Sequence, residues 1–221
     1  MAETVAFPCE ELTLEGRFHS GSAGAGVVVC HPLPLYGGDM TNPVVTALAH
    51  TYQDRDCSWL TFNFRGVGNS GGAYDNGVGE QRDVAAAVGF LHRQGVSIVH
   101  LAGYSFGAWV NAMSGDRLAD IGGQIMVSPP VAMLDFSCIG PVPGLQLVIT
   151  GGRDGYAPPQ LLEGLIPQWA PDAVMTVLTH ADHFYSGQIG RLQQILDEHL
   201  AAKFDAASGD MSVGAAAENR K

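Results

Sequence analysis

The feature that most constrains the fold of this chain is a serine between two glycines, placed where an apolar run meets a segment of small residues. The apolar run at residues 98–102 leads into Gly103-Tyr104-Ser105-Phe106-Gly107. This order predicts a strand, a tight turn and a helix, with the Ser105 hydroxyl exposed at the carboxyl end of the strand. The turn holds Ser105 in a sparsely allowed backbone conformation, which is tolerated because Gly103 and Gly107 lack a Cβ. The pattern therefore favours a nucleophilic serine over an ordinary turn.

Strand-like and helix-like segments alternate along nearly the whole chain. Short apolar runs predict strands, and segments with apolar residues at helical spacing separate them. Such alternation builds a mostly parallel α/β sheet of about seven to eight strands, covered by helices on both faces, with ligands bound at the carboxyl ends of the strands. The expected strands lie at residues 25–30, 59–64, 98–102, 123–127, 145–150 and 173–178, after two short antiparallel strands within residues 4–19.

The length of the chain bounds its domain organisation. At 221 residues, it is long enough for one domain with a sizeable core. We expect this domain to occupy residues 1–204. Residues 205–221 are small and polar without periodicity, and we expect them to form a flexible C-terminal tail.

The charge balance restricts the class of partner. The formal net charge is −11, whereas nucleic acid or an anionic membrane surface would require a basic face. No apolar stretch approaches the about 18 residues of a membrane span, and the first residues show no signal peptide. The 4 cysteines are scattered without a Cys-x-x-Cys pair, which argues against a cysteine zinc site and indicates reduced thiols. We therefore expect a cytoplasmic protein without membrane or nucleic-acid partners.

Two polar residues follow late strands in the order that a serine nucleophile needs. A serine hydroxyl is a weak nucleophile at neutral pH, so it requires a base within hydrogen-bond reach and an acid that orients the base. Asp154 lies in the turn after the expected strand at 145–150, and His183 lies just after the expected strand at 173–178. We therefore predict catalytic roles for Ser105, Asp154 and His183.

Neighbouring residues compete for these roles. Asp135 follows an earlier strand and is the main rival as the acid, whereas Asp182 is expected to fix the loop backbone because adjacent side chains rarely face each other. His180 is the rival base, and it lies closer to the end of the strand. The His-x-Asp-His spacing would suit a metal, but no further ligand cluster supports one. We expect no metal and no cofactor.

An oxyanion hole requires two backbone N–H donors. One is expected from Phe106, the residue after the serine. The other is expected from the loop at residues 31–38, where two prolines have no N–H to give and leave Leu33 as the best donor. Leu35 and Tyr36 are the alternatives for this second donor.

Several motifs together resemble the small bacterial α/β hydrolases related to dienelactone hydrolases. His-Pro-Leu-Pro-Leu-Tyr-Gly-Gly at residues 31–38 is similar to their loop, in which the histidine is expected to hold the backbone. Further similar segments are Phe-Asn-Phe-Arg-Gly-Val-Gly-Asn-Ser-Gly-Gly at 62–72 and Asp-Asn-Gly at 75–77. The serine turn and Ala-Asp-His-Phe at 181–184 complete a resemblance that covers residues 5–203.

This resemblance implies the α/β-hydrolase fold, a catalytic triad of Ser105, Asp154 and His183, and esterase-type activity. Two positions depart from the family pattern. The family loop usually reads His-Pro-His-Pro, and Leu33 replaces its second histidine; a backbone donor survives this change, but a side-chain role does not. Ser105 stands where dienelactone hydrolases carry a cysteine, so lactone hydrolysis does not transfer to this chain.

The segment between the expected strands at 123–127 and 145–150 is too short and too rich in proline for a helical cap domain. We therefore expect an open site shaped by loops, which disfavours long-chain triglycerides as substrates. Arg65 and Arg153 lie near the expected mouth, where loop anchoring is favoured over attraction of an acidic substrate. The side chains expected to line an acyl pocket are Tyr36, Leu35, Tyr156 and Phe184.

Three functions fit these features. The first is a serine hydrolase of the carboxylesterase type, which cleaves small carboxylic esters through an acyl-enzyme intermediate. The second is a thioesterase that acts on acyl thioesters, and the third is a catalytically silent binding protein with the same scaffold. The intact set of Ser105, Asp154 and His183 favours an enzyme with a small-molecule ester as its substrate.

Overall fold

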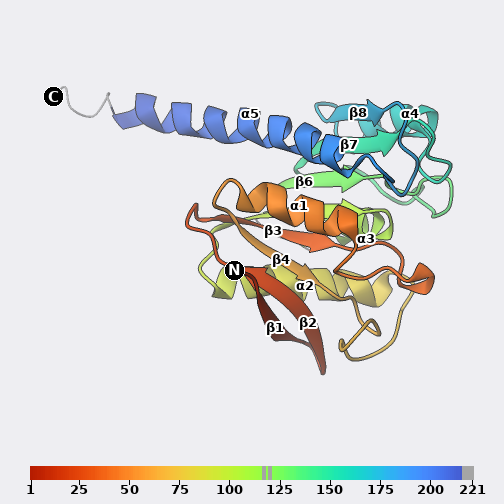
Figure 1. The fold of residues 1–221 in the computed structure, drawn as a ribbon, viewed down its shortest axis with the longest axis horizontal. Helices are drawn as coiled ribbons and strands as arrows, with labels where there is room; N and C mark the ends of the chain where they lie inside the picture. Colours follow the sequence, from red (N-terminus) through yellow and green to blue (C-terminus); the bar gives the residue numbers. More distant parts are fainter. Residues whose placement is uncertain (116–117, 119–120, 216–221) are drawn as a thin grey trace.

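The apolar run at residues 25–30 forms strand β3 (Ala25–Cys30), in which every residue is buried. It lies near the middle of an 8-stranded sheet with the order β1-β2-β4-β3-β5-β6-β7-β8 (Figure 1). The structure is a computed structural model that describes residues 1–115, 118 and 121–215, with residues 204–215 described by their backbone only. The prediction of a mostly parallel α/β sheet is confirmed.

The sheet combines an antiparallel N-terminal hairpin with a parallel remainder. β1 pairs antiparallel with β2, and β2 pairs antiparallel with β4. All the other neighbouring strands are parallel, so their carboxyl ends meet at one edge. The other strands are β1 (Glu3–Cys9), β2 (Leu12–His19), β4 (Ser58–Phe62), β5 (Ile98–Tyr104), β6 (Ile121–Val127), β7 (Leu145–Gly151) and β8 (Val174–Leu178).

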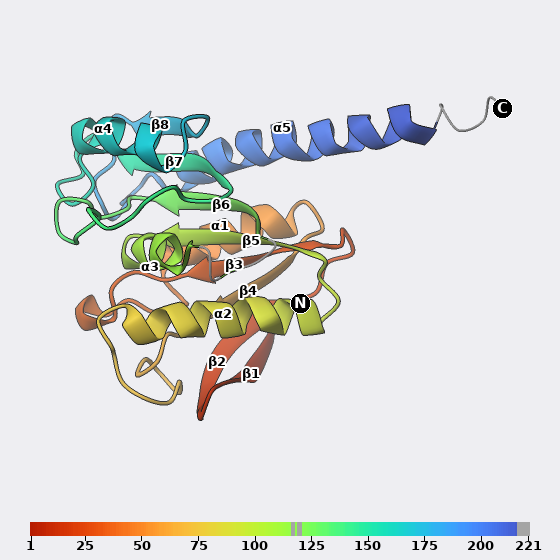
Figure 2. The same cartoon turned by 180° about the vertical axis from the view of Figure 1, so that it is seen from behind.

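Helices cover both faces of this sheet, as the alternating pattern predicts. α1 and α5 pack on one face, seen in front in Figure 1, and α2, α3 and α4 pack on the other, seen in front in Figure 2. Buried apolar side chains of the strands fill the space between each helix layer and the sheet. The helices are α1 (Pro43–Gln53), α2 (Val78–Arg93), α3 (Phe106–Ser114), α4 (Pro159–Trp169) and α5 (Ile189–Ala215), with a 3-10 turn η1 (Pro34–Tyr36).

The connection between β6 and β7 contains no cap domain. Residues 128–144, all of which are described, form turns and bends without a helix or strand. Pro129 and Pro130 follow the end of β6, where proline cannot donate to a strand or helix ladder. The carboxyl edge of the sheet is therefore covered only by loops on this side.

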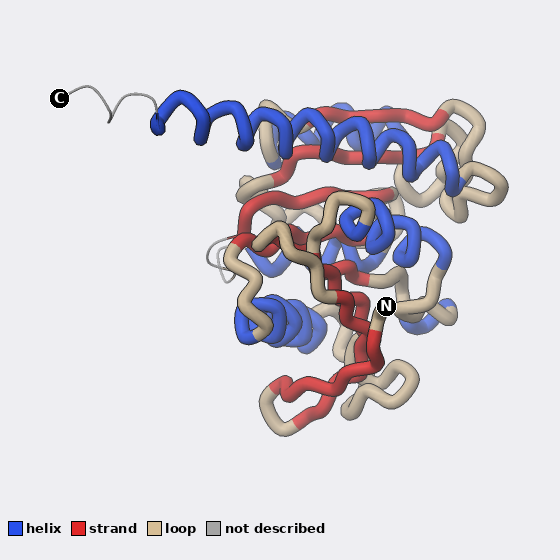
Figure 3. Tube along the Cα trace, turned by 60° about the vertical axis from the view of Figure 1, so that its left-hand side comes forward, coloured by secondary structure: helices blue, strands red, loops and turns tan. Residues whose placement is uncertain are grey.

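The last helix is longer than the sequence predicts. We expect a tail from Asp205, but α5 continues to Ala215 and projects beyond the sheet in all views (Figures 1–3). Alanines at 201, 202, 206 and 207 favour a helix by propensity, which a search for hydrophobic periodicity overlooks. The flexibility of residues 205–221 stays a prediction, and 216–221 lie outside the described residues.

Within the described part, no helix is both long and apolar enough to cross a membrane.

Candidate active site

Ser105 occupies the turn between β5 and α3 in a backbone conformation that side chains rarely adopt, with φ 53° and ψ −118°. A Cβ on Gly103 would lie 2.5 Å from the backbone of Ala108, and a Cβ on Gly107 would collide with the carbonyl oxygen of Cys30. The first glycine therefore lets α3 turn back onto β5, and the second lets α3 pack against the end of β3. The two glycines of the motif are required by close backbone approach.

The three polar residues predicted to act together are joined by hydrogen bonds. The Ser105 hydroxyl lies 2.9 Å from His183 Nε2, and His183 Nδ1 lies 2.9 Å from Asp154 Oδ2. The carboxylate can only accept, so Nδ1 carries the proton and Nε2 is free to accept from the serine. All three residues are at most 8% exposed. Three separate loops thus bring a hydroxyl, an imidazole and a carboxylate into one hydrogen-bonded series.

Asp154 is held ionised by its surroundings. Burial favours the neutral acid, but hydrogen bonding and attraction by His183, a hydrogen bond from Ser128 and one from the Ala157 N–H outweigh it and lower the pKa of the carboxyl below its usual value. Asp154 Oδ1 also accepts from the N–H of Tyr156 at 2.9 Å and of Ala157 at 2.8 Å. The loop after β7 thus forms a nest of donors around one carboxylate oxygen.

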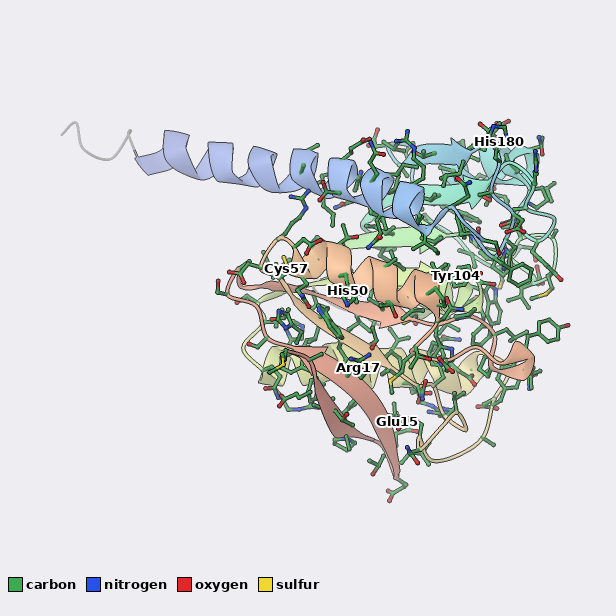
Figure 4. The ribbon with its side chains drawn as sticks, in the orientation of Figure 1. Glu15, Arg17, His50, Cys57, Tyr104 and His180 are labelled. Carbon is green, nitrogen blue, oxygen red and sulfur yellow. The ribbon has the colours of Figure 1, made fainter. Side chains whose placement is uncertain are left out.

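The competing acids and base lie elsewhere. Asp135 is exposed and accepts from the Ser137 N–H at 2.8 Å. Asp182 accepts from the Phe184 N–H at 3.0 Å, so it fixes the loop backbone as expected. His180 is exposed and lies at the outer edge of the sheet, apart from Tyr104 at the end of β5 (Figure 4).

The loop after β3 is fixed by a buried histidine. His31 Nδ1 donates to the Pro32 carbonyl at 2.7 Å, and Nε2 accepts from the Phe64 N–H at 3.0 Å. The side chain is fully buried, and burial lowers its pKa to about 4. His31 is therefore neutral at physiological pH and ties the end of β3 to the segment after β4, in agreement with the predicted role.

The backbone donors proposed for an oxyanion hole flank the serine. Phe106 is the first residue of α3, where helix geometry leaves its N–H without an intrahelical acceptor. Leu33 lines the same pocket as Ser105. Of the two alternatives to Leu33, Tyr36 already donates its N–H to the Leu33 carbonyl at 3.1 Å, and Leu35 does not line the pocket. Phe106 and Leu33 stay the predicted donors of the oxyanion hole.

Asn63, the residue directly after β4, connects several segments through its side-chain amide. Its Oδ1 accepts from the Met40 N–H at 2.8 Å, and its Nδ2 donates to Glu15 Oε1 at 2.6 Å. Glu15 also accepts from the N–H and the amide of Asn69 at 2.7 Å. These bonds link β2, the glycine-rich loop at 65–72 and Met40, which lies between η1 and α1, so the motif at 62–72 has a structural role.

A pocket of about 200 Å³ opens above Ser105. Of the side chains expected to line an acyl pocket, Tyr36, Tyr156 and Phe184 line this one, whereas Leu35 is exposed and is not among its lining residues. Met133, which the sequence analysis missed, comes from the connection between β6 and β7; no periodic pattern marks it. The lining residues are Pro32, Leu33, Tyr36, Gly37, Gly38, Asn42, Tyr104, Ser105, Met133, Tyr156, His183 and Phe184.

The two arginines near the site do not line this pocket. Arg65 is buried and pairs with Asp83, with Nη2 2.7 Å from Oδ1, and its N–H also donates to Oδ2 at 2.9 Å. This is the loop anchor favoured by the sequence. Arg153 is exposed, and its N–H donates to the Ala181 carbonyl at 2.9 Å.

The described residues contain no group of three or more His, Cys, Asp or Glu side chains that could hold a metal ion. What the geometry offers is a hydroxyl within hydrogen-bond reach of an imidazole that can take its proton, and a carboxylate that can balance the charge of that imidazole. This combination suits acyl transfer.

Comparisons with known proteins agree with this fold. The family model described as the alpha/beta hydrolase family matches residues 27–215. An alpha-beta serine hydrolase homologue from Coxiella burnetii is 30% identical, with a TM-score of 0.83 over 90% of this chain and 97% of that chain.

Two further solved structures extend the comparison. XC6422 from Xanthomonas campestris, described as a serine hydrolase without a lid, is 28% identical, with a TM-score of 0.83 over 91% of this chain and 94% of that one. The esterase Pf2001 from Pyrococcus furiosus shares the fold at 19% identity, with a TM-score of 0.75 over 91% and 92% of the two chains. The lidless architecture seen here is therefore shared with a solved relative. The family match over most of the length, together with the serine turn and its hydrogen-bonded histidine, establishes that this chain belongs to the alpha/beta hydrolase family.

Proposed function

We propose that this chain is a carboxylic-ester hydrolase that acts through an acyl-enzyme intermediate on Ser105. The observation that carries the proposal is the hydrogen-bonded series Ser105–His183–Asp154, with 2.9 Å at both of its junctions. A nucleophile within reach of a base, which is itself oriented by a buried carboxylate, is the arrangement that activates a serine.

In the proposed first step, Ser105 Oγ attacks the ester carbonyl carbon while His183 Nε2 takes the hydroxyl proton. The N–H groups of Phe106 and Leu33 stabilise the negative oxygen of the tetrahedral intermediate. The intermediate collapses with loss of the alcohol, whose oxygen receives the proton from His183. Ser105 then carries the acyl group as an ester.

In the second step, His183 takes a proton from a water molecule that attacks the acyl-enzyme. The second tetrahedral intermediate releases the carboxylic acid and returns the proton to Ser105. Asp154 stays ionised throughout and balances the positive imidazolium in both steps.

The pocket supports a small, uncharged substrate. Its rim includes the exposed rings of Tyr36 and Phe184 and the partly exposed ring of Tyr156, and clustered apolar side chains at a cleft favour apolar ligands. Among the residues that line it, none is lysine or arginine. The pocket lining therefore offers no cation to pair with a polyanionic thioester carrier, so an oxygen ester fits better than such a thioester.

We also propose that the substrate is a small-molecule ester and that the protein is located in the cytoplasm.

The test compares the wild type with Ser105→Ala and a matched control, Ser97→Ala. Ser97 is exposed and precedes β5, at the opposite end of the strand that leads to Ser105. We expect Ser105→Ala to abolish both turnover of p-nitrophenyl acetate and labelling by a fluorophosphonate, and Ser97→Ala to retain both. Activity of Ser105→Ala at the level of the wild type would contradict the assignment of Ser105 as the nucleophile.

Two further outcomes separate the alternatives. Absence of fluorophosphonate labelling in the wild type would favour a catalytically silent binding protein. Higher kcat/KM for thiol esters than for oxygen esters of the same acyl group would favour a thioesterase. We expect labelling, and a preference for the oxygen esters.

A further inference from the structure

Three aromatic rings surround the imidazole of His183. The ring centroids of Tyr156, Tyr104 and Phe184 lie 4.8, 5.6 and 5.7 Å from the imidazole centroid. They come from the loop after β7, the end of β5 and the loop before α5. An aromatic ring attracts a cation that lies over its face within about 6 Å of its centroid, and the rings of Tyr156, Tyr104 and Phe184 are inclined to the imidazole by 55°, 34° and 88°.

The proposed reaction requires this imidazole to become positively charged. His183 is 8% exposed, so water solvates the imidazolium poorly. Asp154 balances the charge from the Nδ1 side only. Among the described residues, no other carboxylate is hydrogen-bonded to the imidazole, and the three rings are its aromatic neighbours. The imidazolium would therefore be a largely buried cation beside three electron-rich rings, which can stabilise its charge.

We propose that Tyr156 is a positioning residue whose aromatic ring stabilises the His183 imidazolium during ester cleavage. The inference rests on the proposed function. Tyr156 has the closest ring, and it lies two residues after Asp154 on the same loop. The same short turn therefore supplies both the carboxylate and the ring that face the base.

Tyr156 is also the ring that can be replaced with least disturbance. The hydrogen bonds that fix its loop use its main chain: its N–H donates to Asp154 Oδ1 at 2.9 Å, and its carbonyl accepts from the Ala132 N–H at 2.9 Å. The side chain is 40% exposed. Tyr104, in contrast, is buried and its hydroxyl donates to the His183 carbonyl.

Other ionisable groups face the imidazole and bear on its titration. Asp154 is hydrogen-bonded to it, and Asp182 precedes it in the chain. The phenols of Tyr104 and Tyr185 lie in the same buried region, and the Tyr185 hydroxyl is bonded to Ser128 at 2.8 Å. Replacing the Tyr156 side chain leaves each of these groups in place.

The experiment compares Tyr156→Leu with Tyr156→Phe, which keeps the ring and removes the hydroxyl. The matched control is Tyr36→Leu, the same change in the same pocket at a residue without a ring contact to His183 among the described interactions. We expect Tyr156→Leu to lower the plateau of kcat/KM for p-nitrophenyl acetate about two- to five-fold. The acid limb of the pH profile of kcat/KM in this variant should move to lower pH by about half a unit, because loss of the ring favours the neutral imidazole of His183.

Tyr156→Phe should keep the plateau and the acid limb, and Tyr36→Leu should leave the acid limb in place whatever its effect on KM. Equal pH profiles of kcat/KM for Tyr156→Leu and Tyr156→Phe would overturn the proposal. It would also be overturned if Tyr36→Leu moved the acid limb as far as Tyr156→Leu does.

A second measurement does not depend on turnover. In the Ser105→Ala background, the imidazole C–H resonances of His183 are followed by NMR against pH, and Tyr156→Leu should move the midpoint to lower pH while Tyr156→Phe should not. An unmoved midpoint in Tyr156→Leu overturns this inference alone. Ester hydrolysis that does not depend on Ser105 instead overturns the proposed function.

Discussion

The hydroxyl of Tyr104 donates a hydrogen bond of 2.8 Å to the main-chain carbonyl of His183. Tyr104 directly precedes the proposed nucleophile, and His183 is the proposed base. The bond therefore ties the loop that carries the base to the end of the strand that carries the serine. The bond therefore helps to fix the distance between Ser105 and His183, whose side chains must exchange a proton in the proposed reaction.

Tyr104→Phe should weaken this link while keeping the aromatic ring. A lost hydrogen bond of this kind is worth about 0.5–1.5 kcal/mol, so we expect kcat to fall about two- to ten-fold with little change in KM. Steady-state kinetics with p-nitrophenyl acetate measure the effect, and urea unfolding checks that the variant is folded. Unchanged kcat in a folded variant would show that the loop holds its position without this bond.

His31 should make the stability of the fold depend on pH. Burial lowers its pKa from 6.5 to about 4, so the unfolded chain binds the proton more readily than the folded one. The neutral folded form is therefore favoured above pH 6.5, and this stability is lost as pH falls from about 6.5 to about 4, by about 3 kcal/mol in all.

The measurement is the free energy of unfolding in urea at several pH values for wild type and His31→Gln. Burial also lowers the pKa of His100 to about 4, so the wild type alone does not isolate His31. We expect the variant to be less stable than the wild type at pH 7. Its free energy of unfolding should also change less with pH between pH 6.5 and 4. Parallel curves for the two proteins would contradict the prediction.

Gly107, the second glycine of the serine motif, should not tolerate alanine, whereas Gly164 should. A Cβ on Gly107 would collide with the Cys30 carbonyl, whereas a Cβ on Gly164 in α4 meets no atom outside its own helix within 4 Å. We expect Gly107→Ala to destabilise the fold by about 1–3 kcal/mol and to reduce activity. Gly164→Ala, the matched helical control, should be stabilising by about 0.5–1 kcal/mol. Thermal unfolding compares the two, and an equal effect would refute the steric argument.

The Arg65–Asp83 pair should contribute to folding and not to substrate binding. Both side chains are buried, and removal of one partner leaves the other charge unpaired, at a cost of about 3–5 kcal/mol. We expect Asp83→Asn to show this loss in urea unfolding. The double variant Arg65→Met with Asp83→Leu should recover part of it, because it leaves no buried charge. A loss below about 1 kcal/mol in Asp83→Asn would mean that water reaches the pair.

The sequence was most informative where chemistry and backbone geometry impose the same residue. Gly103 and Gly107 are required by contacts with Ala108 and Cys30, so the motif itself carried the information about the turn. Asp154 could be placed because the acid must follow a particular strand. The role expected for Asp182, fixing the backbone, is also seen in its bond to the Phe184 N–H.

The pocket rim was harder to predict, because side-chain direction in loops has no period. Leu35 and Tyr36 are neighbours in one turn, yet only Tyr36 lines the pocket. Met133 reaches the pocket from a connection whose turns carry no pattern that points to the site. The extent of α5 was underestimated because the helix continues through alanines, which favour helices without forming an apolar stripe.

The order of the strands has a consequence for how the protein is synthesised. Ser105 and His183 are separated by 78 residues, and Asp154 and His183 by 29. A growing chain can therefore complete the strained serine turn long before the base exists. His183 follows the last strand, β8, so a growing chain holds the proposed nucleophile without its proposed base until residue 183 has been synthesised and the edge strand has joined the sheet.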